Sequence, residues 1–332
     1  MALTSEQVLG WSRVCVLLLG MGWAAWMDHK TRRVKNEHWM VWVKPAIFLW
    51  CLELIAREAD WTIYLTASAV VAYASVAIIG RPTFKDIRSG NKLDLTVAIW
   101  YLVSLIGVVI GFSKYGDVDI LDVILGDAVG MAALYWSTLS GLLVIFAIDL
   151  GWRLRMIHGG ADAKALMWVA ILIPNWSTMP VMMDYGDELI LSLPPAISLL
   201  MWGGVSFLLI PFILMVKNLY QGNVRRLGDV RMCWHSTIMP IDMVAKRHVW
   251  LLTSLVEMPD GNIKTYHKTR APRRTPNEDE LAKSINELKQ HDIEYVWVSY
   301  KLPLLVFLFP VIIPMALLGD ITALILLSLI HI

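Results

Sequence analysis

Cysteine is scarce in this chain of 332 residues. The three cysteines, Cys15, Cys51 and Cys233, are too far apart for a CxxC zinc motif or a disulfide framework. Two histidines, His29 and His158, each adjoin an aspartate, but neither shows the HExxH spacing of a helical metal site. We therefore expect neither a metal nor any other cofactor.

Charged residues are also few, at 17% of the chain, whereas hydrophobic residues make up 57% and include 16 tryptophans. This balance excludes an ordinary soluble domain and favours a membrane protein. The lipid bilayer is thus an expected partner, and no nucleic-acid partner is expected. Acidic Glu6 before the first apolar run and a basic block after it are the reverse of a cleavable signal peptide, so that run is predicted to be retained.

Eight apolar runs are candidates for helices that cross a bilayer, which takes about 20 residues each. The predicted fold is an all-α polytopic membrane protein of about eight transmembrane helices, with a small α+β cytoplasmic insertion before the last helix. We expect a transmembrane domain at 1–216, the insertion at 217–301, and a final helix with its tail at 302–332. The eight runs are Val8–Met27, Met40–Ala56, Thr62–Ile79, Leu93–Phe112, Val123–Leu150, Ala163–Met183, Leu189–Val216 and Leu302–Leu318.

The basic residues predict the orientation of these spans, because lysine and arginine accumulate in cytoplasmic loops. Of the 29 basic residues, 25 fall in loops on one side of the predicted topology, and the loops on the other side are acidic. Both termini are therefore predicted to lie outside. The long segment 217–301 is predicted to lie in the cytoplasm of a cell whose membrane the chain crosses several times.

This long segment carries signals for a small α+β structure. Candidate strand residues flank the turn signal Pro259–Asn262, which predicts a hairpin. Thr275 to Glu278 match a capping box with proline at the first helical position, so a helix is expected from there to about His291. The stretch "IEYVWVSY" is predicted to form a strand that leads into the last span.

Two aspartates lie at predicted inner ends of spans, at the same depth on the same face. Asp28 ends the first span and Asp162 begins the sixth, 134 residues later. An ionisable residue at a membrane segment is costly and is therefore a candidate for function. Two carboxylates held close together share a proton, so that one activates a water while the other hydrogen-bonds a substrate carbonyl. This chemistry splits a peptide bond without a metal.

The neighbours of Asp162 fit this chemistry. Gly159 and Gly160 are expected to let the backbone turn tightly and approach an extended peptide, because glycine tolerates conformations that other residues avoid. A helix dipole favours an anion at the N-terminus by roughly 0.3 to 1 kcal/mol and disfavours it at the C-terminus. We therefore hypothesise that Asp162 is mainly the charged partner and Asp28 mainly the protonated one, although a coupled pair titrates as a unit.

Each of these residues also has a plainer interpretation. Asp28 would be an interfacial anchor or helix cap, and Asp162 an N-cap beside a glycine turn. Asp149 is interpreted as an interfacial ion-pair partner. Lys164 would be a snorkelling anchor, a carboxylate partner of Asp162, or both. A transporter or proton-coupled carrier is the alternative class of function; it would use membrane aspartates such as Asp127 as relays and is expected to show two similar halves, which the sequence lacks.

Around both aspartates the chain resembles the archaeal preflagellin and type IV prepilin peptidases, membrane aspartic proteases of the GxGD class. The stretch "MDHKTRRVKNEHW" is similar to the basic stretch that carries that family's first catalytic aspartate, and "GGADAKAL" is similar to the GxGD motif with its following lysine. The sequence departs from the motif at Ala161, where the family has glycine. The resemblance covers roughly residues 8–56 and 123–318, and the span pair within 57–122 is additional.

The resemblance implies that Asp28 and Asp162 form the catalytic pair of an aspartic-type endopeptidase. The residues implied to support the site are Gly159, Gly160, Ala161 and Lys164. The implied substrate is an archaellin or type IV pilin precursor, whose short N-terminal leader is removed at the cytoplasmic face. Bacterial prepilin peptidases also methylate the new terminus through a domain with paired CxxC motifs, and three isolated cysteines argue against that activity here.

Overall fold

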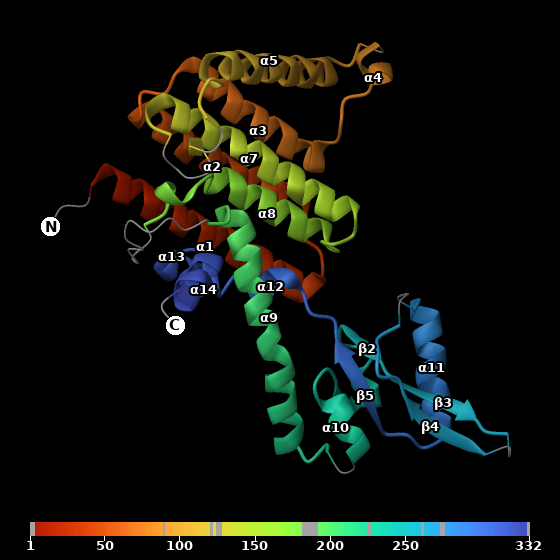
Figure 1. The fold of residues 1–332 in the computed structure, drawn as a ribbon. Helices are drawn as coiled ribbons and strands as arrows, with labels where there is room; N and C mark the ends of the chain where they lie inside the picture. Colours follow the sequence, from red (N-terminus) through yellow and green to blue (C-terminus); the bar gives the residue numbers. More distant parts are fainter. Residues whose placement is uncertain are drawn as a thin grey trace. The chain divides into compact units, whose positions relative to one another are not determined.

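The computed structural model describes residues 4–88, 90–119, 122–123, 128–180, 192–224, 227–259, 262–272 and 276–330. The chain divides into two compact units, which can be followed by colour in Figure 1. Met1–Gly204 and Pro303–Ile332 form the helical unit, and Val205–Leu302 form the smaller unit.

Six helices are long and apolar enough to cross a membrane, and a bent pair near the C-terminus makes a possible seventh. The described residues therefore form a polytopic helical protein, but the predicted count of eight spans is not confirmed. The six helices are α1 (Ser5–Thr31), α2 (Asn36–Ala56), α3 (Trp61–Ile79), α5 (Lys92–Tyr115), α7 (Gly130–Arg153) and α9 (Pro195–Tyr220). A short helix, α4 (Phe84–Arg88), precedes α5.

Polar caps set where several of these helices begin. Thr4 and Gln7 form a capping box at the start of α1. The side chain of Asp60 accepts the backbone N–H of Thr62 at the start of α3, and Asn91 caps α5 in the same way. The helices consequently start one to three residues before the apolar runs that predicted them.

The sixth predicted span, Ala163–Met183, does not continue as a helix beyond Leu172. The helix there, α8 (Gly160–Leu172), has 13 residues, which is about 20 Å and less than the roughly 30 Å of hydrocarbon in a bilayer. Pro174 explains the end, because the residue before a proline is driven out of the helical region. Ile173 is accordingly extended, with φ −129° and ψ 79°, and a 3-10 turn, η1 (Trp176–Thr178), follows. The last residues of the predicted span lie outside the described residues.

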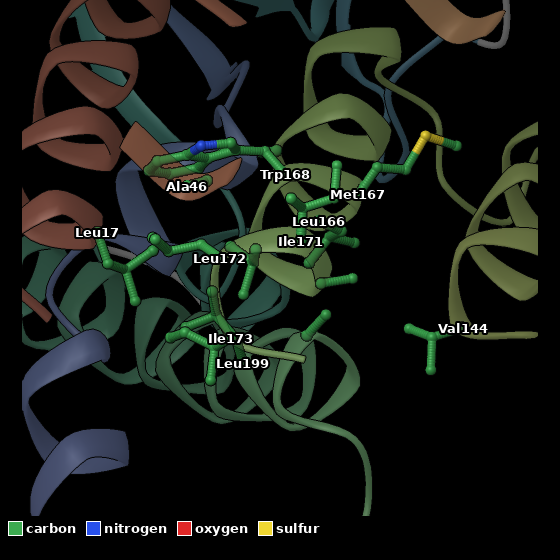
Figure 2. Close-up of a cluster of buried hydrophobic side chains, with 14 of the residues drawn as sticks. Leu17, Ala46, Val144, Leu166, Met167, Trp168, Ile171, Leu172, Ile173 and Leu199 are labelled. Atoms are coloured by element: carbon green, nitrogen blue, oxygen red, sulfur yellow. The ribbon is translucent and has the colours of Figure 1, made fainter. Parts of the chain in front are cut away.

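Helix α8 lies at the centre of the helical unit. Every residue from Ala165 to Ile173 is buried, and α1, α2, α3, α7 and α12 all contact it. A helix that is apolar on all sides is expected to occupy a core. Figure 2 shows α8 side chains among those of the surrounding helices, which include Leu17, Ala46, Val144 and Leu199.

The last predicted span, Leu302–Leu318, is broken in the structure into α12 (Leu304–Leu308) and α13 (Ile312–Leu318). Pro310 stands at the break, where a proline ring clashes with the preceding helical turn. Gly319, with φ 74°, then turns the chain into α14 (Ile321–Ile330), which is inclined by 53° to the preceding segment. The buried carboxylate of Asp320 fixes this corner, since it accepts the backbone N–H of Leu193 at 2.8 Å.

The smaller unit contains two antiparallel sheets. One has the strand order β1-β5-β2, and the other is the hairpin β3-β4. The predicted hairpin around Pro259 and the predicted strand that ends the unit are therefore confirmed. The elements are α10 (Leu227–Cys233), β1 (Thr237–Pro240), η2 (Ile241–Met243), β2 (Val249–Leu251), β3 (Thr253–Glu257), β4 (Ile263–His267), α11 (Glu278–Gln290) and β5 (Tyr295–Tyr300).

Helix α11 covers the larger sheet and begins later than predicted. Its Ile285 and Leu288 belong to one apolar cluster with strand residues such as Val298. The capping box joins Asn277 to Glu280, whereas the prediction placed it at Thr275 to Glu278. Asparagine is at least as good an N-cap as threonine, and a glutamate stands at the required third position after it. Thr275 itself lies outside the described residues.

Candidate active site

Asp28 lies in the last turn of α1, on the buried face of that helix. Leu17, Met21 and Ala24 have no exposed surface and precede it at helical spacing. Residues spaced by three and four lie on one helix face, so Asp28 continues an apolar stripe, and it is itself only 8% exposed. Helix α1 ends directly after it, where Arg32 adopts a left-handed conformation and donates its backbone N–H to the carbonyl of Asp28 at 3.0 Å.

Asp162 occupies the third position of α8 and continues a second buried stripe, formed by Leu166, Val169 and Ile173, which have no exposed surface. Its carboxylate folds back over the start of the helix and accepts the backbone N–H of Gly159, the N-cap residue. This is the returning half of a capping box, and it satisfies an amide that the helix leaves without a partner.

The two glycines before Asp162 provide space rather than unusual backbone conformations. Gly159 has φ −94° and ψ 126°, and Gly160 is helical, so the expectation that conformational freedom explains them is wrong. A Cβ on Gly159 would lie 2.2 Å from Oδ2 of Asp162, and one on Gly160 would lie 3.0 Å from Trp152. Ala161 is also helical, so its methyl group meets no left-handed geometry that would disfavour it.

The structure brings Asp28 and Asp162 together. Helix α1 contacts α8, and the two carboxylates are close enough to repel each other. A glycine on α1 permits this approach, because a Cβ on Gly20 would come within 2.6 Å of the indole of Trp168. The same indole donates to the carbonyl of Trp42 on α2 at 2.9 Å, so the three helices are held as a group.

Lys164 does not pair with Asp162 within the described residues. Its ammonium donates to Oδ1 of Asn36 at 2.8 Å and lies 5.9 Å from the ring of Trp152. Asn36 in turn donates to the carbonyl of Ile78. Of the two interpretations offered for this lysine, the contacts support an anchor between the ends of α8, α2 and α3.

Of the other acidic residues considered, Asp149 is an ion-pair partner, as predicted. It accepts from Nε of Arg153 at 2.8 Å and from the hydroxyl of Tyr73 at 3.1 Å. Asp127 lies outside the described residues. Among the described residues, no three His, Cys, Asp or Glu side chains are gathered so that they could hold a metal ion.

A second group of charges, not singled out from the sequence, lies between the N-terminal half of α1 and the C-terminal end of α2. Arg13 of α1 is 1% exposed and pairs with Oε2 of Glu53 on α2 at 2.6 Å, and Arg57 approaches the same carboxylate at 3.3 Å. The signal was available, because an arginine and a glutamate inside neighbouring apolar runs are expected to pair.

The chain is similar to a preflagellin peptidase of Methanococcus voltae. The two are 25% identical over 249 residues, an alignment that covers 71% of this chain and 90% of that protein. No model of a known protein family matches the chain. The similarity supports the resemblance that the two aspartate motifs suggested, at a distant level.

Proposed function

We propose that the chain is a membrane aspartic endopeptidase that removes the N-terminal leader from archaellin or type IV pilin precursors. The observation that carries the proposal is the contact between α1 and α8, which brings Asp28 and Asp162 near each other although they lie 134 residues apart in the sequence. Similarity to a preflagellin peptidase supports the same activity. The alternative of a purely structural role, in which both aspartates are only helix caps, does not explain why two acids lie near each other among apolar helices.

The proposed reaction uses one ionised and one protonated aspartate. The ionised carboxylate takes a proton from water as the water oxygen bonds to the scissile carbonyl carbon, and the protonated carboxyl gives its proton to the carbonyl oxygen. The resulting diol collapses when the C–N bond breaks. The first aspartate then protonates the leaving nitrogen, and the second recovers a proton from a diol hydroxyl, which restores the starting pair.

The same proposal specifies the substrate's position. The leader would reach the ends of α1 and α8 in an extended form from the cytoplasmic side, while the apolar helix that follows it stays in the bilayer. The inner-side orientation is supported by the distribution of basic residues, 25 of 29 on one predicted face. Gly159 leaves the space that the carboxylate of Asp162 occupies, since a Cβ there would lie 2.2 Å from Oδ2.

Cleavage of a defined precursor tests the proposal. Purified full-length protein in detergent is mixed with a preflagellin or prepilin that keeps its leader, and the new N-terminus is identified by mass spectrometry. We expect cleavage by the wild type and none by Asp28→Asn or Asp162→Asn. A cooperative thermal unfolding transition in each variant serves as the control that both are folded. Cleavage that neither substitution affects would refute the aspartic mechanism.

The carrier alternative has one observation in its favour, the buried pair of Arg13 and Glu53. This pair is separated from Asp28 by 15 residues of α1, or about 22 Å along the helix axis. Because Arg13 and Glu53 are in direct contact, their ion pair is better explained as a structural link between α1 and α2 than as a group that releases a transported ion. A carrier needs a membrane and a gradient, so cleavage in detergent discriminates between the two classes.

A further inference from the structure

An apolar groove lies in the helical unit where α2, α3 and α8 contact one another. Its volume is about 250 Å³, and Trp100 of α5 also lines it. The helices α3 and α5, which supply one side of the groove, form the span pair that the family resemblance does not cover. The aliphatic side chains of its walls include Val43, Ile47, Val71, Ile78, Met167 and Ile171.

Two lysines line the same groove. Lys164 is the fifth residue of α8, and its ammonium donates to Oδ1 of Asn36 at 2.8 Å. Lys44 lies within α2, a helix that is long and apolar enough to cross a membrane. The side chain of Lys44 is exposed, and within the described residues it has no hydrogen bond or ion pair. A lysine in such a span is costly and calls for a partner.

The positions of the two lysines bring their ammonium groups toward one end of the groove. Asn36, which binds Lys164, is the first residue of α2. Lys44 follows it by eight residues, or about 12 Å along the helix axis. A helical side chain leans toward the N-terminus of its helix, and a lysine stem can lie along apolar surface while its ammonium reaches the head-group region. The ammonium of Lys44 is therefore expected nearer to Asn36 than its backbone is.

The walls of the groove suit hydrocarbon, because their polar groups already have partners. The hydroxyl of Ser75 donates to a carbonyl of its own helix at 2.7 Å. The indole N–H of Trp100 donates to the hydroxyl of Ser68 at 2.8 Å, and that of Trp168 donates to the carbonyl of Trp42 at 2.9 Å. Among the described residues that line the groove, none is acidic, so the two lysines give it a net positive charge.

We propose that this groove binds an anionic phospholipid, with a hydrocarbon chain along its walls and the phosphate between the ammonium groups of Lys44 and Lys164. Basic pockets between transmembrane helices bind phosphate head groups in this way. The phosphate supplies a partner for Lys44, and Lys164 keeps two N–H donors beyond the one that Asn36 accepts. This inference goes beyond the proposed peptidase activity and gives the additional span pair a role.

The size of the groove favours a lipid chain over the apolar helix of a precursor. A helix with its side chains is about 10 to 12 Å across and rises 5.4 Å per turn, so a single turn occupies more than about 400 Å³. That volume exceeds the 250 Å³ of the groove. A hydrocarbon chain is thinner, and its phosphate also matches the charge of the two lysines.

Native mass spectrometry of the full-length protein tests the inference. Protein in detergent is titrated with phosphatidylglycerol and, separately, with phosphatidylcholine of the same chains, which gives an apparent Kd for each lipid. The variants are Lys44→Met, Lys44→Arg and Lys164→Met. Lys92→Met is the matched control, because Lys92 is an exposed lysine at the start of α5 that does not line the groove. Thermal unfolding checks that each variant is folded.

We expect the wild type to bind phosphatidylglycerol at least about tenfold more tightly than phosphatidylcholine. Each methionine variant at Lys44 or Lys164 should weaken phosphatidylglycerol binding about fivefold and leave phosphatidylcholine binding unchanged, because a lysine beside anionic lipid contributes about that factor. Lys44→Arg and Lys92→Met should bind as the wild type does.

Equal Kd values for the two lipids, or unchanged phosphatidylglycerol binding in both methionine variants, would overturn the inference. Two competition arms identify the occupant. Displacement of the lipid by an excess of inorganic phosphate would mean a simple anion site, and displacement by a precursor would assign the groove to the substrate, so either result also overturns it. No cleavage is measured, so the outcome is independent of the proposed peptidase activity.

Discussion

The C-terminal end of α7 and the neighbouring ends of α1 and α8 use carboxylates in opposite ways. Asp149 on α7 is held by an arginine on its own helix and by the hydroxyl of Tyr73 on α3. Asp28 and Asp162 instead lie near each other on two contacting helices, and Asp162 has one backbone amide as its hydrogen-bond partner in the described residues. All three acids are at least half-buried at the ends of apolar helices.

The difference separates structural acids from reactive ones. A carboxylate whose oxygens are matched by a cation and a donor is stabilised in its ionised form and gains little by accepting a proton. Two carboxylates that repel each other share a proton readily, which is the property that acid–base chemistry needs. Burial alone, which Asp28 and Asp149 have to the same degree, therefore does not identify the site.

The largest expected effect comes from replacing one acid of each kind by asparagine and comparing the two variants. Asp162→Asn should reduce kcat by about a hundredfold to ten-thousandfold, because proton transfer by a positioned side chain contributes about 10² to 10⁴. Asp149→Asn should keep kcat within about threefold but lower the free energy of unfolding by about 1 kcal/mol, since one charge-assisted hydrogen bond is lost. Precursor cleavage and thermal unfolding measure the two quantities. Similar losses of kcat in both variants would break the comparison.

A smaller effect is expected at the glycine beneath the Asp162 carboxylate. In Gly159→Ala the new Cβ would lie 2.2 Å from Oδ2, so the carboxylate must move by about an ångström, which costs about a hundredfold in kcat. The matched control is Gly151→Ala on α7, where the nearest atom would be 3.5 Å away in ordinary contact with Ile157. That variant should be at least as stable as the wild type and fully active. Equal kcat in both alanine variants would contradict the close fit around Asp162.

Lys164 should give an effect smaller again, because its ammonium bonds Asn36 rather than a carboxylate. Lys164→Met is expected to keep kcat within about threefold with an unmoved pH profile, and to lower the free energy of unfolding by about 1 kcal/mol. Asn36→Ala should reproduce the loss of stability. An acidic limb that shifts in Lys164→Met would show that the lysine acts on Asp162 after all.

Much of this arrangement follows from the sequence, because helical spacing is simple. Asp28 follows Ala24 by four residues and Asp162 precedes Leu166 by four, so each acid can be placed on an apolar stripe before any coordinates exist. The β3-β4 hairpin was predictable for a similar reason, since its turn residues are specific.

Other features depend on contacts between distant residues and could not be predicted. The carboxylate of Asp162 occupies space that a side chain at position 159 would fill. From the sequence alone, the glycine pair is explained equally well by a need for this space and by a need for conformational freedom of the backbone. The partner of Lys164 lies 128 residues away. The early end of α8 could have been predicted, because Pro174 is visible in the sequence and the residue before a proline is disfavoured in a helix. The prediction was misled by the length of the apolar run, which indicates how much chain is suited to the hydrocarbon region and not how much of it is helical.

The smallest expected effect concerns a second fully matched carboxylate, Asp60, in the loop before α3. Its hydrogen bonds with Lys114 at 2.6 Å, and then with Thr62, lower the pKa of Asp60 to about 2. A folded-state pKa below the unfolded value of about 3.9 stabilises the protein above that value, and the stabilisation is lost as the pH falls toward 2. Asp60→Asn keeps a good N-cap, so it should lower the free energy of unfolding at pH 6 by no more than about 1 kcal/mol for this solvent-accessible pair, and by nothing measurable near pH 2. A deficit that is the same at both pH values would mean that the charge of Asp60 is not what stabilises the loop.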